Sequence, residues 1–225
     1  KALLRNTALV TSIAVFLVSL SLLFSFKADF GGFQLTQSRY EDLLWIRALG
    51  VRYRVGIDGI SLFLVLLTTF LTPICILSSY RAVDSRVKEY MMALLVLETG
   101  ILGALVALDV FLFYIFWEVM LIPMYLIIGI WGGSRGRYAT IKFSVFSMVS
   151  SALMLIVILY VTLKGADGGL PNFAVEHVWA TAQSLTQTEQ SCLFLAIFCA
   201  FAVKVPLFPF HSWLRDAQIQ AQTGG

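Results

Sequence analysis

Three ionisable residues interrupt long apolar runs, and they are the residues of this sequence most able to do chemistry. Glu98 lies in LLVLETGIL, Glu118 in FLFYIFWEVMLIPMY and Lys204 in FAVKVPLFPFHSWL. A charge in the middle of a bilayer is costly, so such residues usually face a partner or a water-filled path. We therefore interpret the three as candidates for a proton or ion pathway.

The neighbours of Glu118 favour a proton-carrying role. Helical spacing places Tyr114, Glu118 and Tyr125 on one stripe. Pro123 removes the donor that would pair with the Val119 carbonyl, which loosens the helix one turn beyond the acid. A buried carboxyl group stays neutral without a partner and ionises near a cation, as a proton carrier must. A static ion pair that fixes helix packing is the alternative.

Lys204 precedes a predicted helix break. Pro206 and Pro209 remove two backbone donors, so the helix is expected to break there. Within a membrane, non-helical backbone is tolerated only where protein covers it or where it lines a wet cavity. Discontinuous helices of this kind carry the ion sites of many transporters. His211 shares the face of Lys204 if the helix resumes, and histidine is the residue type whose charge changes most readily near neutral pH. An interfacial histidine with a satisfied hydrogen bond is the alternative.

Three further residues are candidate relay members. Glu98 is followed by Gly100 and Gly103, which allow another helix to approach closely. Lys142 lies at the start of an apolar run, where its ammonium group could instead reach the membrane surface. Asp216 follows the broken segment. We keep Glu98, Lys142 and Asp216 as relay candidates.

The composition is that of an integral membrane protein. The 225 residues are 59% hydrophobic and 13% charged, whereas a soluble domain is about half apolar and about one quarter charged. The net charge of +3 is too small to suggest nucleic-acid binding. Three dispersed cysteines indicate neither a disulfide framework nor a zinc site. The sequence has no phosphate loop, metal-spaced cluster or nucleophile elbow, and we expect no metal, cofactor or redox site on this chain.

The elements that must position these residues are membrane helices. A helix needs roughly 20 apolar residues to cross the hydrocarbon core. The fold predicted is an all-α bundle of six spans in a single transmembrane domain over 1–225, the last span broken by its prolines, with a short surface helix near 175–183. The spans are Leu3–Phe26, Ile57–Ser79, Met91–Leu108, Val110–Trp131, Phe143–Leu163 and Ser191–Pro209.

The distribution of basic residues predicts an orientation. With six spans, nine Lys and Arg residues fall on the side of the N-terminus and six on the opposite side. Short basic loops stay on the cytoplasmic or matrix face. We therefore expect the N-terminus on that face.

Three segments carry a family resemblance. FLFYIFWEVMLIPMYLIIGIWGG, FAVKVPLFPFHSWLRDAQIQAQTGG and GIDGISLFLVLLTTF resemble the antiporter-like membrane-arm subunits of respiratory NADH:ubiquinone oxidoreductase (complex I), and subunit 4 in particular, from about Arg5 to Gly225. The resemblance implies a fold of about fourteen helices with inverted repeats, each containing a broken helix. The six spans would be the second to seventh helices, with the rest expected on another chain unless this sequence is part of a longer one.

The resemblance also implies a function. In the family a buried Glu pairs with a buried Lys to pump protons; these roles would fall on Glu118 and Lys204, with His211 in the following relay. The enzyme would be the H⁺-translocating NADH:ubiquinone reductase, with NADH, FMN, iron–sulfur clusters and ubiquinone bound by other subunits. Other membrane-arm subunits and lipids such as cardiolipin would be partners. The location implied is the mitochondrial inner membrane, with the bacterial plasma membrane as the alternative.

One segment departs from the family pattern. Where the family usually reads WLPDAHxxAPT, this chain has WLRDAQIQAQT at Trp213–Thr223, so Arg215, Gln218 and Gln222 replace Pro, His and Pro. The second histidine of the motif is therefore absent. Two alternatives stay open: a subunit of a cation/proton antiporter without redox coupling, and a structural fragment of the membrane arm that does not pump.

Overall fold

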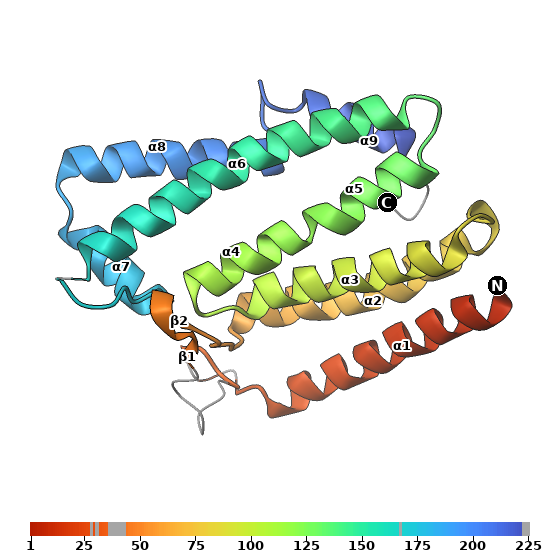
Figure 1. Cartoon of the computed structure of the whole chain (residues 1–225). Coiled ribbons are helices and arrows are strands. Elements are labelled where there is room, and N and C mark those ends of the chain that lie inside the picture. The colour runs from red at the N-terminus through yellow and green to blue at the C-terminus, as the bar shows by residue number, and fades with distance from the viewer. Residues whose placement is uncertain (28, 30–31, 36–43, 167, 222–225) are drawn as a thin grey trace.

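A computed structural model describes residues 1–27, 29, 32–35, 44–166 and 168–221, and it is mostly helical (Figure 1). In this part of the chain, two short strands and a 3₁₀ turn (Arg47–Leu49) form a small hairpin that was not predicted. The elements are α1 (Ala2–Ser25), β1 (Leu44–Ile46), β2 (Val51–Arg52), α2 (Gly59–Ala82), α3 (Val87–Val106), α4 (Val110–Val119), α5 (Leu121–Trp131), α6 (Gly136–Lys164), α7 (Val175–Ser184), α8 (Gln187–Lys204) and α9 (Ser212–Gln220).

Five helical stretches among the described residues are long and apolar enough to cross a membrane. They are α1, α2, α3, the α4–α5 pair and α6. Helix α8 covers the start of the sixth predicted span but is not among the five, because polar residues open it and Lys204 closes it. The polytopic helical fold is thus confirmed with five spans, and the sixth span and its proline break stay predictions.

Two predicted span boundaries differ from the structure. The fifth span was expected to begin at Phe143, but α6 begins at Gly136. Lys142 interrupts the apolar run but not the helix, because lysine is a good helix former and its ammonium pairs with the Asp216 carboxylate. The third span likewise begins earlier, at Val87, and ends at Val106.

The helix that carries Glu118 is interrupted where proline predicts it. Asp109 caps its start: the carboxylate accepts the N–H groups of Phe111 and Leu112, both at 3.0 Å. The helix is then interrupted at Met120, between α4 and α5. Pro123 has no N–H for the Val119 carbonyl, which accounts for the interruption one turn before it.

At the end of the bundle where α4 begins, the connecting segments are joined by backbone bridges and an ion pair. Residue Val55 pairs with Ala107, and Asp109 pairs with Ala174, in isolated antiparallel bridges. The Arg54 guanidinium also donates to both oxygens of Glu176, at 3.0 and 3.2 Å. These contacts fix the start of α4, and the predicted surface helix is present as α7 directly beyond them.

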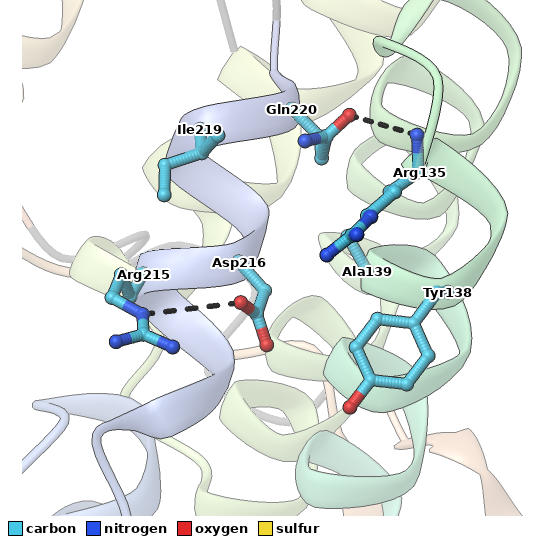
Figure 2. A pocket seen from close by; sticks show the side chains of 7 residues that line it. All are labelled: Arg135, Tyr138, Ala139, Arg215, Asp216, Ile219 and Gln220. Atoms are coloured by element: carbon cyan, nitrogen blue, oxygen red, sulfur yellow. Dashed lines mark hydrogen bonds and ion pairs between the residues drawn. The ribbon is translucent and has the colours of Figure 1, made fainter.

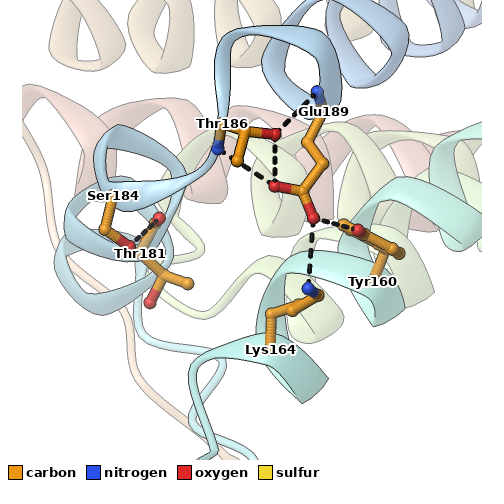
Figure 3. Close-up of polar contacts among 6 residues, drawn as sticks. All are labelled: Tyr160, Lys164, Thr181, Ser184, Thr186 and Glu189. Carbon is orange, nitrogen blue, oxygen red and sulfur yellow. Dashed lines mark hydrogen bonds and ion pairs between the residues drawn. The ribbon is translucent and has the colours of Figure 1, made fainter.

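A polar clasp joins α6 to the start of α8 at the same end (Figure 3). The Glu189 carboxylate accepts hydrogen bonds from the hydroxyls of Tyr160 at 2.5 Å and Thr186 at 2.7 Å. Lys164 Nζ lies 3.1 Å from the same carboxylate. The Tyr160 hydroxyl, followed by Thr186 and Lys164, lowers the pKa of Glu189 to about 2.

The clasp predicts an unusual pH dependence of stability. Because the folded pKa of Glu189 is depressed from 4.5 to about 2, its contribution is complete above pH 4.5 and disappears as the pH falls toward 2. We expect Glu189→Gln to lower the thermal unfolding temperature at pH 7, and the gap from the unmodified protein to close between pH 4.5 and 2. Glu89→Gln, on an exposed turn of α3, serves as the control. A gap that persists at pH 2 contradicts the assignment.

The helices pack in sequence order across the bundle. Helices α1, α2 and α3 lie together on one side and α6 and α8 on the other, with α4 and α5 between them (Figure 1). Gly100 and Gly103 of α3 face Met120 and the Phe116 ring, and a Cβ at Gly103 would overlap that ring. The predicted close helix approach at these glycines is confirmed, and it holds α3 against the helix of Glu118.

Candidate functional site

A cavity of about 450 Å³ opens where α3, α4, α5, α6, α8 and α9 meet. Most of its lining is apolar, and the polar groups come from Trp117, Lys204, Trp213 and Gln218. Within the described residues, Lys204 is the one charged side chain that lines it. The arrangement places one cation in an apolar cleft at the meeting point of the two sides of the bundle.

The end of α8 positions Lys204. It is the last residue of the helix, which ends just before Pro206. Beyond it, the Leu207 N–H donates to the Ala202 carbonyl at 2.8 Å, and the buried Trp213 indole donates to the Val203 carbonyl at 2.8 Å. The Ala202 and Val203 carbonyls at the end of α8 are therefore both paired, and the lysine is fixed at a helix end.

The ammonium group of Lys204 lies over an aromatic ring. Its Nζ is 4.8 Å from the centroid of the Trp117 ring, which is cation–π geometry. In the described part of the chain no carboxylate lies within 4.0 Å of this ammonium. Lys204 is thus held by a ring and not by a tight ion pair, which leaves it free to change partners.

Glu118 follows Trp117 directly and interacts electrostatically with Lys204. Its Oε1 atom is buried and has no hydrogen-bond partner. The structure therefore brings the predicted acid and base together without a direct salt bridge. A carboxyl oxygen left unsatisfied beside a cation–π lysine is a place where a proton or a water molecule can be accommodated.

Two predicted positions are wrong. Tyr125 was expected on the stripe of Glu118, but it lies on α5 beyond the interruption and is 48% exposed. His211 was expected on the face of Lys204. The helix resumes only at Ser212, and the His211 ring is exposed and stacks on Phe208 with centroids 5.8 Å apart.

Glu98 lies at a similar depth but in a separate cavity. Because α3 and α4 run antiparallel through the turn at 107–109, Glu98, eight residues before the end of α3, and Glu118, eight residues after the start of α4, occupy nearby levels. Glu98 is 4% exposed and lines a cavity of about 170 Å³ between α2 and α3, with Thr72 beside it. Its Oε1 atom is also buried without a partner. Because α3 stands between the two cavities, the structure does not join Glu98 directly to Lys204.

The other two relay candidates form an ion pair. Lys142 Nζ lies 2.7 Å from Asp216 Oδ2 and 3.2 Å from the Ser212 carbonyl. The Lys142 ammonium lowers the pKa of Asp216. This pair ties α9 to α6, next to the packed rings of Phe143 and Trp213, whose centroids are 5.3 Å apart.

If the Lys142–Asp216 pair holds α9 against α6, its loss should weaken the docking of α9. Asp216→Asn leaves the Lys142 ammonium without its charged partner and removes a charged hydrogen bond between α9 and α6. We expect a lower unfolding temperature and faster hydrogen exchange in α9. Asp84→Asn, at an exposed carboxylate on the same end of the bundle, serves as the control. Equal exchange in both variants contradicts a docking role.

The reasoning from sequence missed both tryptophans. Trp117 holds the ammonium and Trp213 satisfies a carbonyl of the broken segment. Among the described residues, no group of three or more His, Cys, Asp or Glu side chains could hold a metal ion.

Comparison with known proteins gives one consistent family. A transmembrane family described as NADH:quinone oxidoreductase/Mrp antiporter matches residues 107–225. NADH-quinone oxidoreductase subunit M of Rhodobacter capsulatus is 46% identical over 227 residues, covering 97% of this chain and 42% of the relative. NADH-ubiquinone oxidoreductase chain 4 of Marchantia polymorpha is 37% identical over 224 residues, covering 99% of this chain and 43% of the relative.

A solved structure has the same fold. A chain of respiratory complex I from Thermus thermophilus with bound NADH superposes with a TM-score of 0.82 at 29% identity, over 96% of this chain and 43% of that chain. This chain thus spans about two fifths of the length of its relatives. Since the family match covers more than half of the chain, including Glu118 and Lys204, the chain belongs to the NADH:quinone oxidoreductase/Mrp antiporter transmembrane family.

Proposed function

We propose that this chain is a proton-translocating, antiporter-like subunit, or the N-terminal part of one, in the membrane arm of respiratory complex I. In this role it couples NADH:ubiquinone electron transfer to proton pumping through Glu118 and Lys204. The observation that carries the proposal is Lys204, a cation at the end of an interrupted helix, set in an apolar cavity next to an unsatisfied Glu118 carboxyl oxygen.

The mechanism follows from the geometry of this pair. Lys204 is the proton carrier, because its ammonium rests on the Trp117 ring and is not locked in an ion pair. When the charge of Glu118 is close, the protonated lysine is stabilised; when that influence is withdrawn, burial favours release of the proton. The helix end supplies the freedom for this switch, since nonhelical backbone there can rearrange at low cost.

The redox chemistry belongs to other subunits in this proposal. NADH, FMN, iron–sulfur clusters and ubiquinone bind elsewhere in the assembly, and this chain contributes only to proton transfer. Partners are the other membrane-arm subunits and membrane lipids such as cardiolipin. The proposed location is the mitochondrial inner membrane; the Rhodobacter relative supports a bacterial plasma membrane as the alternative.

Isolation of the native assembly tests the proposal. We would extract membranes in mild detergent, capture this chain through a tag, and identify the co-migrating polypeptides and their masses by mass spectrometry. Co-migration of NADH-oxidising subunits with this chain is the expected result. Antiporter-type membrane proteins without NADH-oxidising subunits would overturn the complex I assignment.

Two alternatives each have a specific observation in their favour. The matching family includes Mrp antiporters as well as NADH:quinone oxidoreductases, and both would use a buried acid and base. The altered segment after Trp213 keeps a non-pumping structural role open, because Arg215 and Gln218 replace the usual residues; Gln222 and Thr223 lie outside the described residues. Co-migration with NADH-oxidising subunits separates the antiporter alternative from the complex I proposal, and proton transport by the isolated assembly separates the structural alternative.

A further inference from the structure

A third cavity, of about 280 Å³, lies at the end of the bundle that holds the N-terminus (Figure 2). Its walls are the start of α6 and one face of α9. Two arginines, Arg135 and Arg215, stand on opposite walls with Asp216 between them (Figure 2). No step of the proposed proton transfer uses this cavity.

The cavity carries uncompensated positive charge. Asp216 is its one acid, and that carboxylate is already bound by Lys142 at 2.7 Å, with Arg215 Nε 4.0 Å away. Within the residues that the structure describes, the Arg135 guanidinium joins no ion pair. Three cations thus share one carboxylate, and the site is complementary to an anion with several acceptor oxygens.

The wall of the cavity is held in place. Gln220 Oε1 accepts the Arg135 N–H at 3.1 Å, and the Gln220 carbonyl accepts the Gly133 N–H at 3.0 Å. Together with the Lys142–Asp216 pair, these bonds fix α9 against the start of α6. The two guanidinium groups are therefore presented from a defined scaffold, not from a loose surface.

An exposed apolar stripe leads away from the cavity along α6. Tyr138, at the cavity, and Ile141 are each 61% exposed. The stripe continues at helical spacing with Val145, 55% exposed, and Met148, 66% exposed. Since α6 is a membrane span, this stripe lies in the hydrocarbon region with the basic cavity at its end. A charged head group would contact the basic cavity, and an acyl chain would contact the apolar stripe of α6.

We propose that this cavity binds the phosphate group of an anionic phospholipid, with one acyl chain lying along the α6 stripe. Arg135 and Arg215 bind the phosphate oxygens, and the Tyr138 hydroxyl is placed to donate to the head group. The inference gives a site to the lipid partner of the proposed function but does not depend on proton transport. Its failure would leave the proton pathway intact.

Photolabelling of the native assembly tests this site. The tagged assembly, extracted in mild detergent and depleted of lipid, is incubated with photoactivatable phosphatidylglycerol or with phosphatidylcholine of the same acyl chains. We expect phosphatidylglycerol to label the α6 segment 138–149 and phosphatidylcholine to label it weakly. Inorganic phosphate at millimolar concentration is the competitor that separates a lipid site from a site for soluble phosphate, and we expect it to leave the labelling unchanged.

Substitutions assign the labelling to the two arginines. Arg135→Gln with Arg215→Gln removes both charges, and each basic residue near an anionic lipid contributes a factor of about 5, so we expect a loss of affinity of roughly 30-fold. Arg137→Gln, two residues further along the chain but outside the cavity, is the matched control and should bind normally. If the double variant fails to assemble, Arg215→Gln alone should lose about fivefold, since the family usually has proline there.

Three results would overturn the inference. Equal labelling of the double variant and the Arg137→Gln control would show that the cavity binds no lipid phosphate. Complete competition by inorganic phosphate would make it a site for soluble anions. Crosslinking of the α6 stripe to another protein subunit in unextracted membranes would make the surface a protein interface.

Discussion

Replacing Lys204 by alanine is expected to stop proton transport through this subunit while the assembly stays intact. The lysine is the one charged side chain that lines the central cavity in the described part of the chain. Loss of a positioned proton carrier typically costs a factor of about 100 or more. The measurement is proton uptake by proteoliposomes per NADH oxidised. Lys88→Ala, at an exposed lysine on α3, should pump normally.

Lys204→Arg separates a proton carrier from a static ion pair. Arginine keeps the positive charge and can still stack on Trp117, but it does not release its proton. A carrier role therefore predicts that Lys204→Arg is almost as inactive as Lys204→Ala. Normal pumping by the arginine variant, or unchanged stoichiometry in the assembled alanine variant, would contradict the carrier role.

Glu118→Gln is expected to have the second largest effect, a reduction in proton transport of about 10- to 100-fold. Glutamine keeps the shape of the side chain but removes the charge that acts on Lys204. The effect should be smaller than that of Lys204→Ala, because Glu118 acts through the lysine. Proton uptake is measured in the same proteoliposomes at a fixed rate of NADH oxidation.

The matched control for Glu118 is Glu89→Gln, an exposed carboxylate in the first turn of α3. It removes the same charge far from the cavity and should leave pumping unchanged. Equal pumping by the Glu118→Gln variant and this control would mean that Glu118 only supports helix packing. Partial activity of Glu118→Asp would further favour a charge effect over a packing effect.

The bundle was readable from the sequence because lipid imposes a simple rule on length and polarity. Apolar runs located five spans, and the missing N–H of Pro123 located the interruption next to Glu118. Boundaries were less predictable: Lys142 looked like the end of a run, but its charge is neutralised by Asp216 from a distant segment. A rule based on local hydropathy takes no account of Asp216, because this partner is distant in the sequence.

The site was predictable in its residues and not in its contacts. Glu118 and Lys204 stand out as charges in apolar runs, whereas the ring of Trp117 under the ammonium depends on how α4 meets α8. Glu98 is also a charged residue in an apolar run, but it lines the cavity between α2 and α3 and not the cavity of Lys204. The position of His211 depends on where the helix resumes after the prolines. A helical wheel assumes an unbroken helix and so cannot place this residue.

The central claim is that Glu118 and Lys204 act as one proton-transferring unit, and a double substitution tests it most directly. Proton uptake per NADH oxidised would be measured for Glu118→Gln, Lys204→Gln and the combined variant in the same assembled preparation. Residues that act as a unit are strongly non-additive. We predict that the combined variant pumps no less than Lys204→Gln alone. Losses that multiply, with the combined variant far below either single one, would contradict the claim.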